Sequence, residues 1–308
     1  MLFLRYIGKR LLQTVFVLFA VSVIAFLLVH LAPGSPAQMM LPEAATEEQI
    51  KEMEIKLGLD KPLIEQYWTY IRGILQGDLG TSSNYRVPVA SVIADRFPSS
   101  LKLTAVASVF VLIISIPLGI IAGVNQAKPI DIIAMVFAII GQSMSVVWLG
   151  VLNIYVFSVW LDILPSVGSQ TWLHFILPAL TLGYPTAALM TRMGRSGMID
   201  VLREDYITAT FAKGINRATV YCKYAFKNAL IPIVTIFAVQ IGQFLSASIV
   251  VETMFGIAGI GQLVNQSVGV RDYALVQSML LIIAAIFAFL NLLVDIINSL
   301  IDPRIALK

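Results

Sequence analysis

Six stretches of this sequence are long and apolar enough to cross a lipid bilayer as α-helices. A helix rises about 1.5 Å per residue, so roughly 20 apolar residues span the ~30 Å hydrocarbon core. The chain is 58% hydrophobic and 13% charged, whereas soluble domains carry about 25% charged residues. We therefore predict an all-α integral membrane protein with six transmembrane helices. The stretches run over Leu11–Ala32, Leu103–Val124, Ile132–Val159, Ile176–Thr191, Leu230–Val251 and Ala274–Leu300.

Lysine and arginine predict the orientation, because short cytoplasmic loops carry more of them than outer loops do. The Val159–Phe175 segment has neither residue, and the loop after the fifth stretch has only Arg271. The loop between the fourth and fifth stretches is the richest in basic residues. We therefore predict that both termini and the 192–229 loop are cytoplasmic. The basic residues of this loop are Arg192, Arg195, Arg203, Lys213, Arg217, Lys223 and Lys227.

This topology divides the chain into four parts. Residues 1–32 form a cytoplasmic tail and the first membrane helix, and residues 33–100 form an extracytoplasmic loop domain. Residues 101–303 form the transmembrane core, which includes the 192–229 loop, and residues 304–308 form a second cytoplasmic tail. The two prolines of the short fourth stretch, Pro178 and Pro185, are compatible with a membrane helix when neighbouring helices satisfy the freed carbonyls.

The long outer loop has helical signals of its own. Thr46-Glu-Glu-Gln49 predicts the start of a helix that ends at Leu57, where Gly58 stops it. Pro62 starts a second helix with three aromatic residues, and the segment from Gly77 to Asn84 is rich in turn residues. Two interpretations stay open for this region: a small packed cap, or a surface that docks a partner.

Several classes of function are disfavoured by what the sequence lacks. The middle of every stretch is free of Asp, Glu, Lys and Arg, and the nearest exception, Asp295, lies toward the cytoplasmic end of the last stretch. This pattern argues against a proton-driven carrier and a charged channel filter, although sodium coupling through backbone carbonyls stays open. No phosphate-binding Gly-x-x-x-x-Gly-Lys-Ser/Thr loop occurs. A single cysteine, Cys222, and a net charge of +3 favour neither a cysteine metal cluster nor nucleic-acid binding.

The 192–229 loop contains the most informative pattern. Residues 205–214 read as a short helix, and Gly214 suits a left-handed C-terminal cap. Ile207 and Phe211 share one face at an i, i+4 spacing. Periodicity alone leaves two interpretations: a helix that docks into a groove on another protein, or one that lies on lipid headgroups.

Here the chain resembles the permeases of binding-protein-dependent ABC importers. In that family a Glu-Ala-Ala-type triplet precedes a glycine by a short spacing, and Thr208-Ala209-Thr210 and Gly214 occupy those places. The long interval from Gly214 to Pro232 resembles the oligopeptide/dipeptide/nickel subfamily. The resemblance covers nearly the whole chain in order. Other matching segments are Leu57–Pro62, Gly77–Gly80, Arg203–Ile207, Ala212–Gly214, Asn228–Leu230, Arg271–Tyr273, Asn291–Asp295 and Asp302–Arg304.

The resemblance implies a type I ABC importer permease fold in a prokaryotic plasma membrane, and a transport subunit rather than an enzyme. It implies a homologous second permease, two cytoplasmic ATPase subunits that bind ATP and Mg, and an extracytoplasmic substrate-binding protein. The chain itself would contact membrane lipid and hold no cofactor. The implied cargo is di- or oligopeptides, with nickel or a metal chelate as the alternative within the subfamily.

The resemblance also places the contact with the ATPase on the 205–214 helix. Two positions depart from the subfamily: Phe211 stands where a basic residue is usual, and Ala258 where a proline is common. Rival functions are a secondary carrier that works alone and an intramembrane hydrolase that uses Ser143 or His174. No motif indicates a catalytic residue, a metal ligand or a substrate site. The implied coupling residues are Asp205, Tyr206, Thr208, Ala209, Thr210, Phe211, Lys213 and Gly214.

Overall fold

The computed structural model describes residues 2–31, 37–38, 41 and 45–301. Within these ranges the elements are helices, joined by turns and irregular segments. The single β-bridge within them joins Thr81 and Pro88. The chain forms two compact units, one of residues Met1–Ser99 with Ala258–Leu292 and one of Ser100–Ile257 with Leu293–Lys308. The all-α prediction is confirmed.

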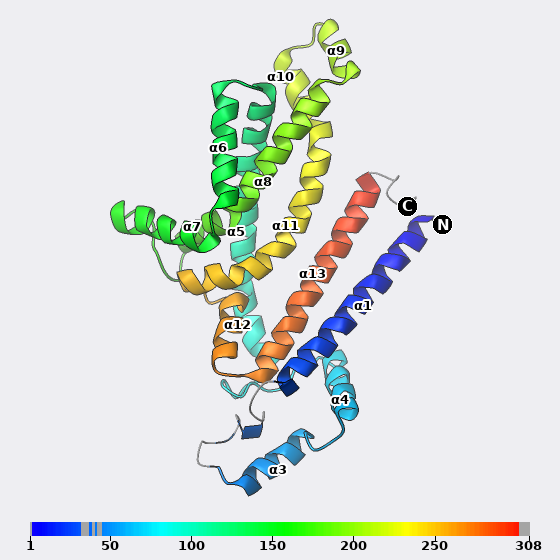
Figure 1. The fold of residues 1–308 in the computed structure, drawn as a ribbon, viewed down its shortest axis with the longest axis vertical. Helices are drawn as coiled ribbons and strands as arrows, with labels where there is room; N and C mark the ends of the chain where they lie inside the picture. Colours follow the sequence, from blue (N-terminus) through cyan, green and yellow to red (C-terminus); the bar gives the residue numbers. More distant parts are fainter. Residues whose placement is uncertain (1, 32–36, 39–40, 42–44, 302–308) are drawn as a thin grey trace. The chain divides into compact units, whose positions relative to one another are not determined.

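The first unit contains α1 (Leu2–Leu31), α3 (Glu47–Leu57), α4 (Leu63–Leu75) and α12 (Ile260–Gly269), with the first part of α5 (Val89–Val124) and most of α13 (Tyr273–Ile301) (Figure 1). The predicted caps of α3 are confirmed: Thr46 and Gln49 form a reciprocal capping box, and Gly58 adopts φ 68°. The buried residues that join α5, α12 and α13 are Val89, Val92, Ile93, Ile260, Leu263, Leu275 and Met279.

The predicted turn cluster after α4 is also confirmed. Gly77 and Gly80 adopt φ values of 81° and 82°, which residues with a β-carbon rarely adopt. Ser82 is fully buried, and its hydroxyl donates a hydrogen bond to Asp272 at the start of α13. The turn therefore stays attached to the beginning of the last membrane helix by a buried polar contact.

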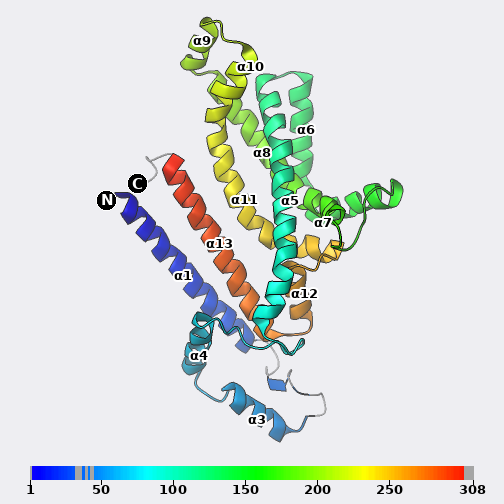
Figure 2. The same cartoon turned by 180° about the vertical axis from the view of Figure 1, so that it is seen from behind.

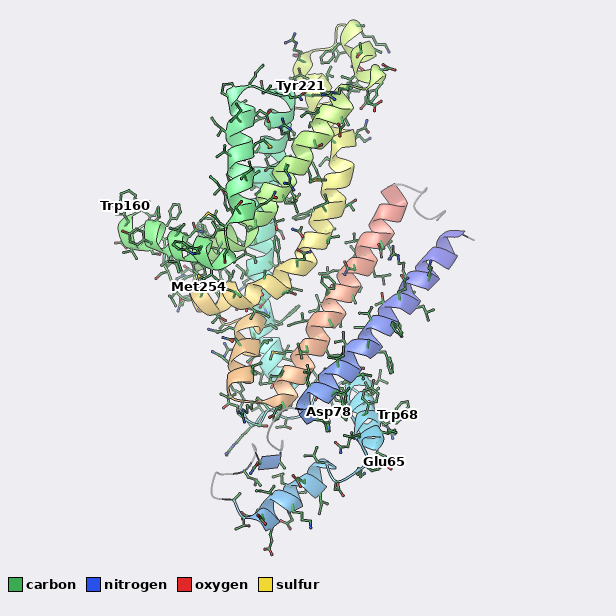
Figure 3. The ribbon with its side chains drawn as sticks, viewed as in Figure 1. Glu65, Trp68, Asp78, Trp160, Tyr221 and Met254 are labelled. Atoms are coloured by element: carbon green, nitrogen blue, oxygen red, sulfur yellow. The ribbon has the colours of Figure 1, made fainter. Side chains whose placement is uncertain are left out.

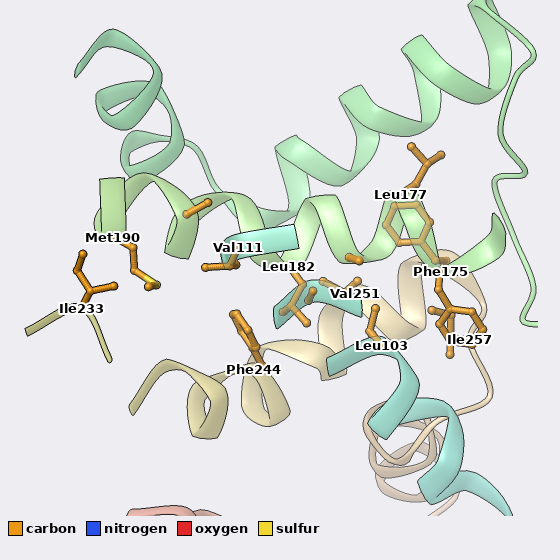
Figure 4. Close-up of a cluster of buried hydrophobic side chains, with 14 residues drawn as sticks. Leu103, Val111, Phe175, Leu177, Leu182, Met190, Ile233, Phe244, Val251 and Ile257 are labelled. Carbon is orange, nitrogen blue, oxygen red and sulfur yellow. The ribbon is translucent and has the colours of Figure 1, made fainter. Parts of the chain in front are cut away.

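The second unit is built around α8 (Ile176–Leu202), which packs against α6 (Pro129–Ser143), α7 (Val146–Asn153) and α11 (Phe226–Phe255). The remainder of α5 (Val89–Val124) joins the same core. Figure 4 shows the core side chains converging between these helices. The largest of these buried side chains belong to Leu103, Leu177, Met190, Phe244, Phe255 and Ile257.

Close backbone contact between α5 and α8 depends on glycine. A β-carbon on Gly119 would lie 3.2 Å from the Gly194 Cα atom, and one on Gly123 would lie 2.5 Å from the Met198 Cβ atom. Small residues let membrane helices approach closely, so that van der Waals contacts replace the hydrophobic effect, which does not operate between helices in lipid. Pro185 lies inside α8 without ending the helix, as predicted.

Within the part of the chain that the structure describes, five helices are long and apolar enough to cross a membrane, or six if one bent pair counts as a span. The expectation of one continuous third helix over Ile132–Val159 is wrong. The segment breaks between α6 and α7 and bends by 110° there. The Ser145 hydroxyl accepts a hydrogen bond from the Val147 N–H, so a new helix begins at this point. The π-helix η1 (Ile154–Trp160) continues α7.

Candidate functional site

The short helix predicted in the 192–229 loop is present as α9 (Asp205–Ala212), which lies between the ends of α8 and α11 (Figure 1). Asp205 occupies the first turn, where a negative charge stabilises the positive end of the helix. Gly214 adopts φ 76°, and its N–H donates to the Phe211 carbonyl over 2.9 Å. The glycine therefore reverses the chain sharply after the helix, as its position in the sequence predicts.

One side of α9 is anchored in a small core of the second unit. Ile207 is only 1% exposed and belongs to a buried cluster. The other members are Met198 from α8, Val220 and Ala225 from the π-helix η3 (Val220–Ala225), and Ala229 from α11. Because Ile207 contacts segments on both sides of the loop, a displacement of α9 would move the ends of α8 and α11 with it.

Two further contacts join α9 to η3 and to the first turn of α11. The Asn228 side-chain amide donates a hydrogen bond to the Tyr206 hydroxyl over 2.6 Å. The Phe211 ring packs edge to face against Tyr221, with ring centroids 6.1 Å apart. Figure 3 shows Tyr221 at this end of the molecule. These contacts come from a side chain at each end of α9, so they restrain its orientation as well as its position.

The opposite side of α9 is exposed and has small side chains in its middle. Asp205, Thr208, Ala209 and Ala212 are all exposed and recur at helical spacing. Thr210 points inward instead: it is buried, and its hydroxyl donates to the Tyr206 carbonyl over 2.6 Å. The Thr208-Ala209-Thr210 triplet is thus divided between an outer surface and an inner contact.

The remaining predicted residues lie on the exposed side or at the end of the helix. Tyr206 and Phe211 are 39% and 36% exposed, so each lines the edge of the surface while its other side holds an internal contact. Lys213 and Gly214 are exposed at the C-terminal end. The phenylalanine does not share the deep burial of Ile207, although the two residues are four positions apart.

A partly buried ion pair joins α6 and α8. Arg195 of α8 donates from both Nε and Nη2 to the two carboxylate oxygens of Asp131 in the first turn of α6, and the Nη2–Oδ2 distance is 2.8 Å. The same carboxylate accepts the Ala127 N–H over 2.9 Å. A bidentate arginine–carboxylate pair fixes both distance and orientation, so it holds α6 in register with α8.

Comparison with known proteins decides the family. The profile of the binding-protein-dependent transport system inner membrane component matches residues 115–307, and the profile of the N-terminal part of such membrane components matches residues 3–104. The chain belongs to this family of ABC importer permeases. It is 43% identical over 305 residues to the glutathione transport system permease protein GsiC of Escherichia coli strain K12, covering 99% of this chain and 100% of the relative. The same values hold for the GsiC protein of Shigella dysenteriae serotype 1.

The permease fold is also seen in a solved structure. Inward-facing conformations of the MetNI methionine ABC transporter contain a chain that matches this permease with a TM-score of 0.55 and 20% sequence identity. The match covers 70% of this chain and 97% of that chain. At this identity the likeness shows the fold, and the predicted ABC importer permease fold is confirmed.

Sequence reasoning missed the buried carboxylates of this permease, because it searched the middle of each membrane stretch and not the ends. Glu252 is fully buried in the last turn of α11 and accepts a hydrogen bond from Ser100 of α5 over 2.7 Å. Asp131 and Arg195 could have been paired from sequence, since both lie on the side predicted to be cytoplasmic. Within the described residues, no three His, Cys, Asp or Glu side chains gather as a metal site would require.

Proposed function

We propose that this permease forms half of the translocation pathway of an ATP-driven importer of short peptides, and that α9 is the element through which the ATPase drives it. The observation that carries the proposal is the two-sided construction of α9. Its outer side presents the small residues Thr208 and Ala209, and its inner side anchors Ile207 between α8 and α11. A helix of this kind can enter a groove on a partner and transmit the partner's movement.

The proposed complex contains this permease, a homologous second permease, two cytoplasmic ATPase subunits and an extracytoplasmic binding protein. ATP and Mg bound by the ATPase subunits supply the energy. In this chain, movement of α9 passes to α8 through Ile207, and to α11 through Ile207 and the Tyr206–Asn228 hydrogen bond. The proposal requires both termini and the α9 loop to face the cytoplasm, as the distribution of basic residues predicts.

Short peptides are the proposed cargo for two reasons. The named relatives carry glutathione, which is a tripeptide. In addition, α11 exposes two uncharged polar side chains, Gln243 and Ser246, among the apolar residues of its membrane span. Such groups are unfavourable against lipid. We assign them to the polar pathway, where they can form hydrogen bonds with the amide groups of a peptide in transit.

The proposed function is tested with the whole complex in proteoliposomes. Glutathione and a dipeptide should accumulate only when ATP and binding protein are supplied, and an uncoupler should not reduce uptake at constant ATP. Gln243→Leu should lower peptide uptake severalfold, whereas Val234→Leu, an exposed position on the same helix, should not. Uptake that collapses with the uncoupler would indicate a secondary carrier. Uptake of nickel without peptide would reject the proposed cargo.

A further inference from the structure

Helix α4 carries an exposed apolar stripe that the other described residues of its unit do not cover. Ile64, Trp68 and Leu75 recur at helical spacing and are 74%, 67% and 82% exposed. Figure 3 shows Trp68 projecting outward from α4. Side chains of this size are seldom left in water as a group, so the stripe indicates an apolar environment on this side of α4.

The neighbouring side of α4 identifies that environment, because it packs along a membrane helix. The Tyr67 hydroxyl lies 2.8 Å from the Ser22 hydroxyl of α1. The Tyr67 ring also packs edge to face against Phe19 and Phe26, with centroid distances of 6.4 and 5.4 Å. Figure 2 shows α4 beside one end of α1. All three α1 residues lie inside the apolar span Gly8–His30, so Tyr67 reaches bilayer depth.

A second contact fixes the position of α4 along α1. The His30 Nε2 atom lies 2.8 Å from the Gln66 side-chain oxygen, and its Nδ1 atom lies 2.9 Å from the Phe26 carbonyl. The Gln66 amide group donates in turn to the carbonyls of Leu59 and Lys61. From Phe19 to His30 the α1 axis rises about 16 Å, at ~1.5 Å per residue. This distance is close to the thickness of one leaflet. Because Gln66 and Tyr67 are adjacent on α4, both contacts hold one end of α4 against the His30 half of the apolar span of α1.

The other side of α4 is polar and exposed. Glu65, Thr69, Arg72 and Gln76 follow one another at helical spacing on that side. The apolar stripe lies between this polar side and the residues that contact α1. A helix with one apolar and one polar side is stable when the apolar side enters the acyl-chain boundary and the polar side meets water, and tryptophan is enriched at that boundary.

We propose that α4 is an interfacial helix whose Ile64, Trp68 and Leu75 side chains contact lipid acyl chains beside α1. In the proposed orientation of the permease this is the extracytoplasmic leaflet. The occupant is lipid rather than the binding protein, because the α1 contacts place α4 alongside an apolar membrane span. The helix then braces the first membrane helix from the outer surface.

The test uses tryptophan as a depth probe in the assembled complex in nanodiscs. The four tryptophans are Trp68, Trp148, Trp160 and Trp172, and replacing the last three with phenylalanine in this permease, and all tryptophans in its partner subunits, leaves one probe. Lipids brominated on the acyl chain should lower Trp68 emission by about twofold or more, and aqueous acrylamide should act weakly. The matched control moves the probe one residue, by Trp68→Phe with Thr69→Trp, and should reverse both results.

Two outcomes would overturn the proposal. The first is strong quenching of Trp68 by acrylamide with no effect of brominated lipid. The second is protection of Trp68 only after the binding protein is added, which would assign the stripe to that protein. If the tryptophan variants do not assemble, a spin label at Leu75→Cys in a Cys222→Ser background distinguishes contact with lipid from exposure to water. Oxygen dissolved in the bilayer should relax this label more than a water-soluble nickel chelate does, and the reverse order would contradict the lipid contact.

Discussion

At the scale of single residues, two buried carboxyl groups at the ends of helices have their partners on a neighbouring helix. Asp131 at the start of α6 is paired with Arg195 of α8, and Glu252 at the end of α11 accepts from Ser100 of α5. A buried charge without a partner is unfavourable by several kcal/mol. These pairs therefore specify which helices lie together more than they add to stability.

The Asp131–Arg195 pair gives the first prediction. Asp131→Asn keeps the size of the side chain but leaves the guanidinium of Arg195, 26% exposed, without its carboxylate. We expect a loss of roughly 1.5–3 kcal/mol, the usual value for a hydrogen bond to a charged group. Chemical unfolding of the purified complex in detergent measures this loss. Asp200→Asn, at an exposed position of α8, is the control and should be neutral. Equal stability of the two variants would show that the pair has no structural role.

At the scale of elements, the packing of α5 against α8 depends on the absence of a β-carbon. Gly123→Ala would place its new methyl group 2.5 Å from the Met198 Cβ atom, and overpacking of this kind costs about 1–3 kcal/mol. Gly269→Ala in α12 has no atom within 4 Å of the added carbon. The first variant should unfold at a lower temperature than the wild type, and the second should not. A Gly123→Ala protein as stable as Gly269→Ala would contradict the observed helix packing.

The elements that sequence predicted well are those whose ends are fixed by local chemistry. Thr46 with Gln49, Gly58 and Gly214 each cap a helix through their own backbone or side chain, so a short window of sequence contains the signal. The bend between α6 and α7 was missed although Gln142, Ser143 and Ser145 interrupt the apolar run there. Ser145 caps α7, but a serine inside a membrane stretch is ordinarily a packing residue.

The parts of the site that sequence did not predict depend on neighbours that are distant along the chain. The family resemblance grouped Thr208, Ala209 and Thr210 in one triplet, but the burial of Thr210 follows from its position over the core around Ile207. The inner partners of α9, Asn228 and Tyr221, come from the far side of a loop. Periodicity predicts which residues share one face of a helix, but the tertiary structure determines which residues pack against that face.

At the scale of the whole molecule, orientation in the membrane is the first property to test. Cys222 is exposed in the segment that follows α9, and it is the single cysteine of the chain. A membrane-impermeant thiol reagent should leave it unlabelled in intact spheroplasts and label it after lysis. In a Cys222→Ser background, Lys51→Cys on the exposed surface of α3 should react before lysis. Ser82 is unsuitable for this purpose because it is buried. Labelling of Cys222 in sealed spheroplasts would reverse the proposed orientation.

The proposed coupling between the ATPase and the membrane helices can be tested at Gly214. A substitution there changes the end of α9 without creating a clash with neighbouring atoms. The φ of 76° at Gly214 strains any residue with a β-branch, although no atom lies within 4 Å of an added β-carbon. Gly77 in the turn after α4 has φ 81° and the same open surroundings, so Gly77→Val is a matched control. Gly214→Asn is a second control, because asparagine tolerates the left-handed conformation better than valine does.

The measurement is ATP hydrolysis by purified complexes of matched yield, with and without binding protein and peptide. We predict that Gly214→Val assembles normally but loses most of the stimulation by loaded binding protein. Gly77→Val should keep full stimulation, and Gly214→Asn should keep an intermediate level. Stimulation of Gly214→Val at the wild-type level would show that α9 is an interfacial helix and that the ATPase drives this permease through another contact.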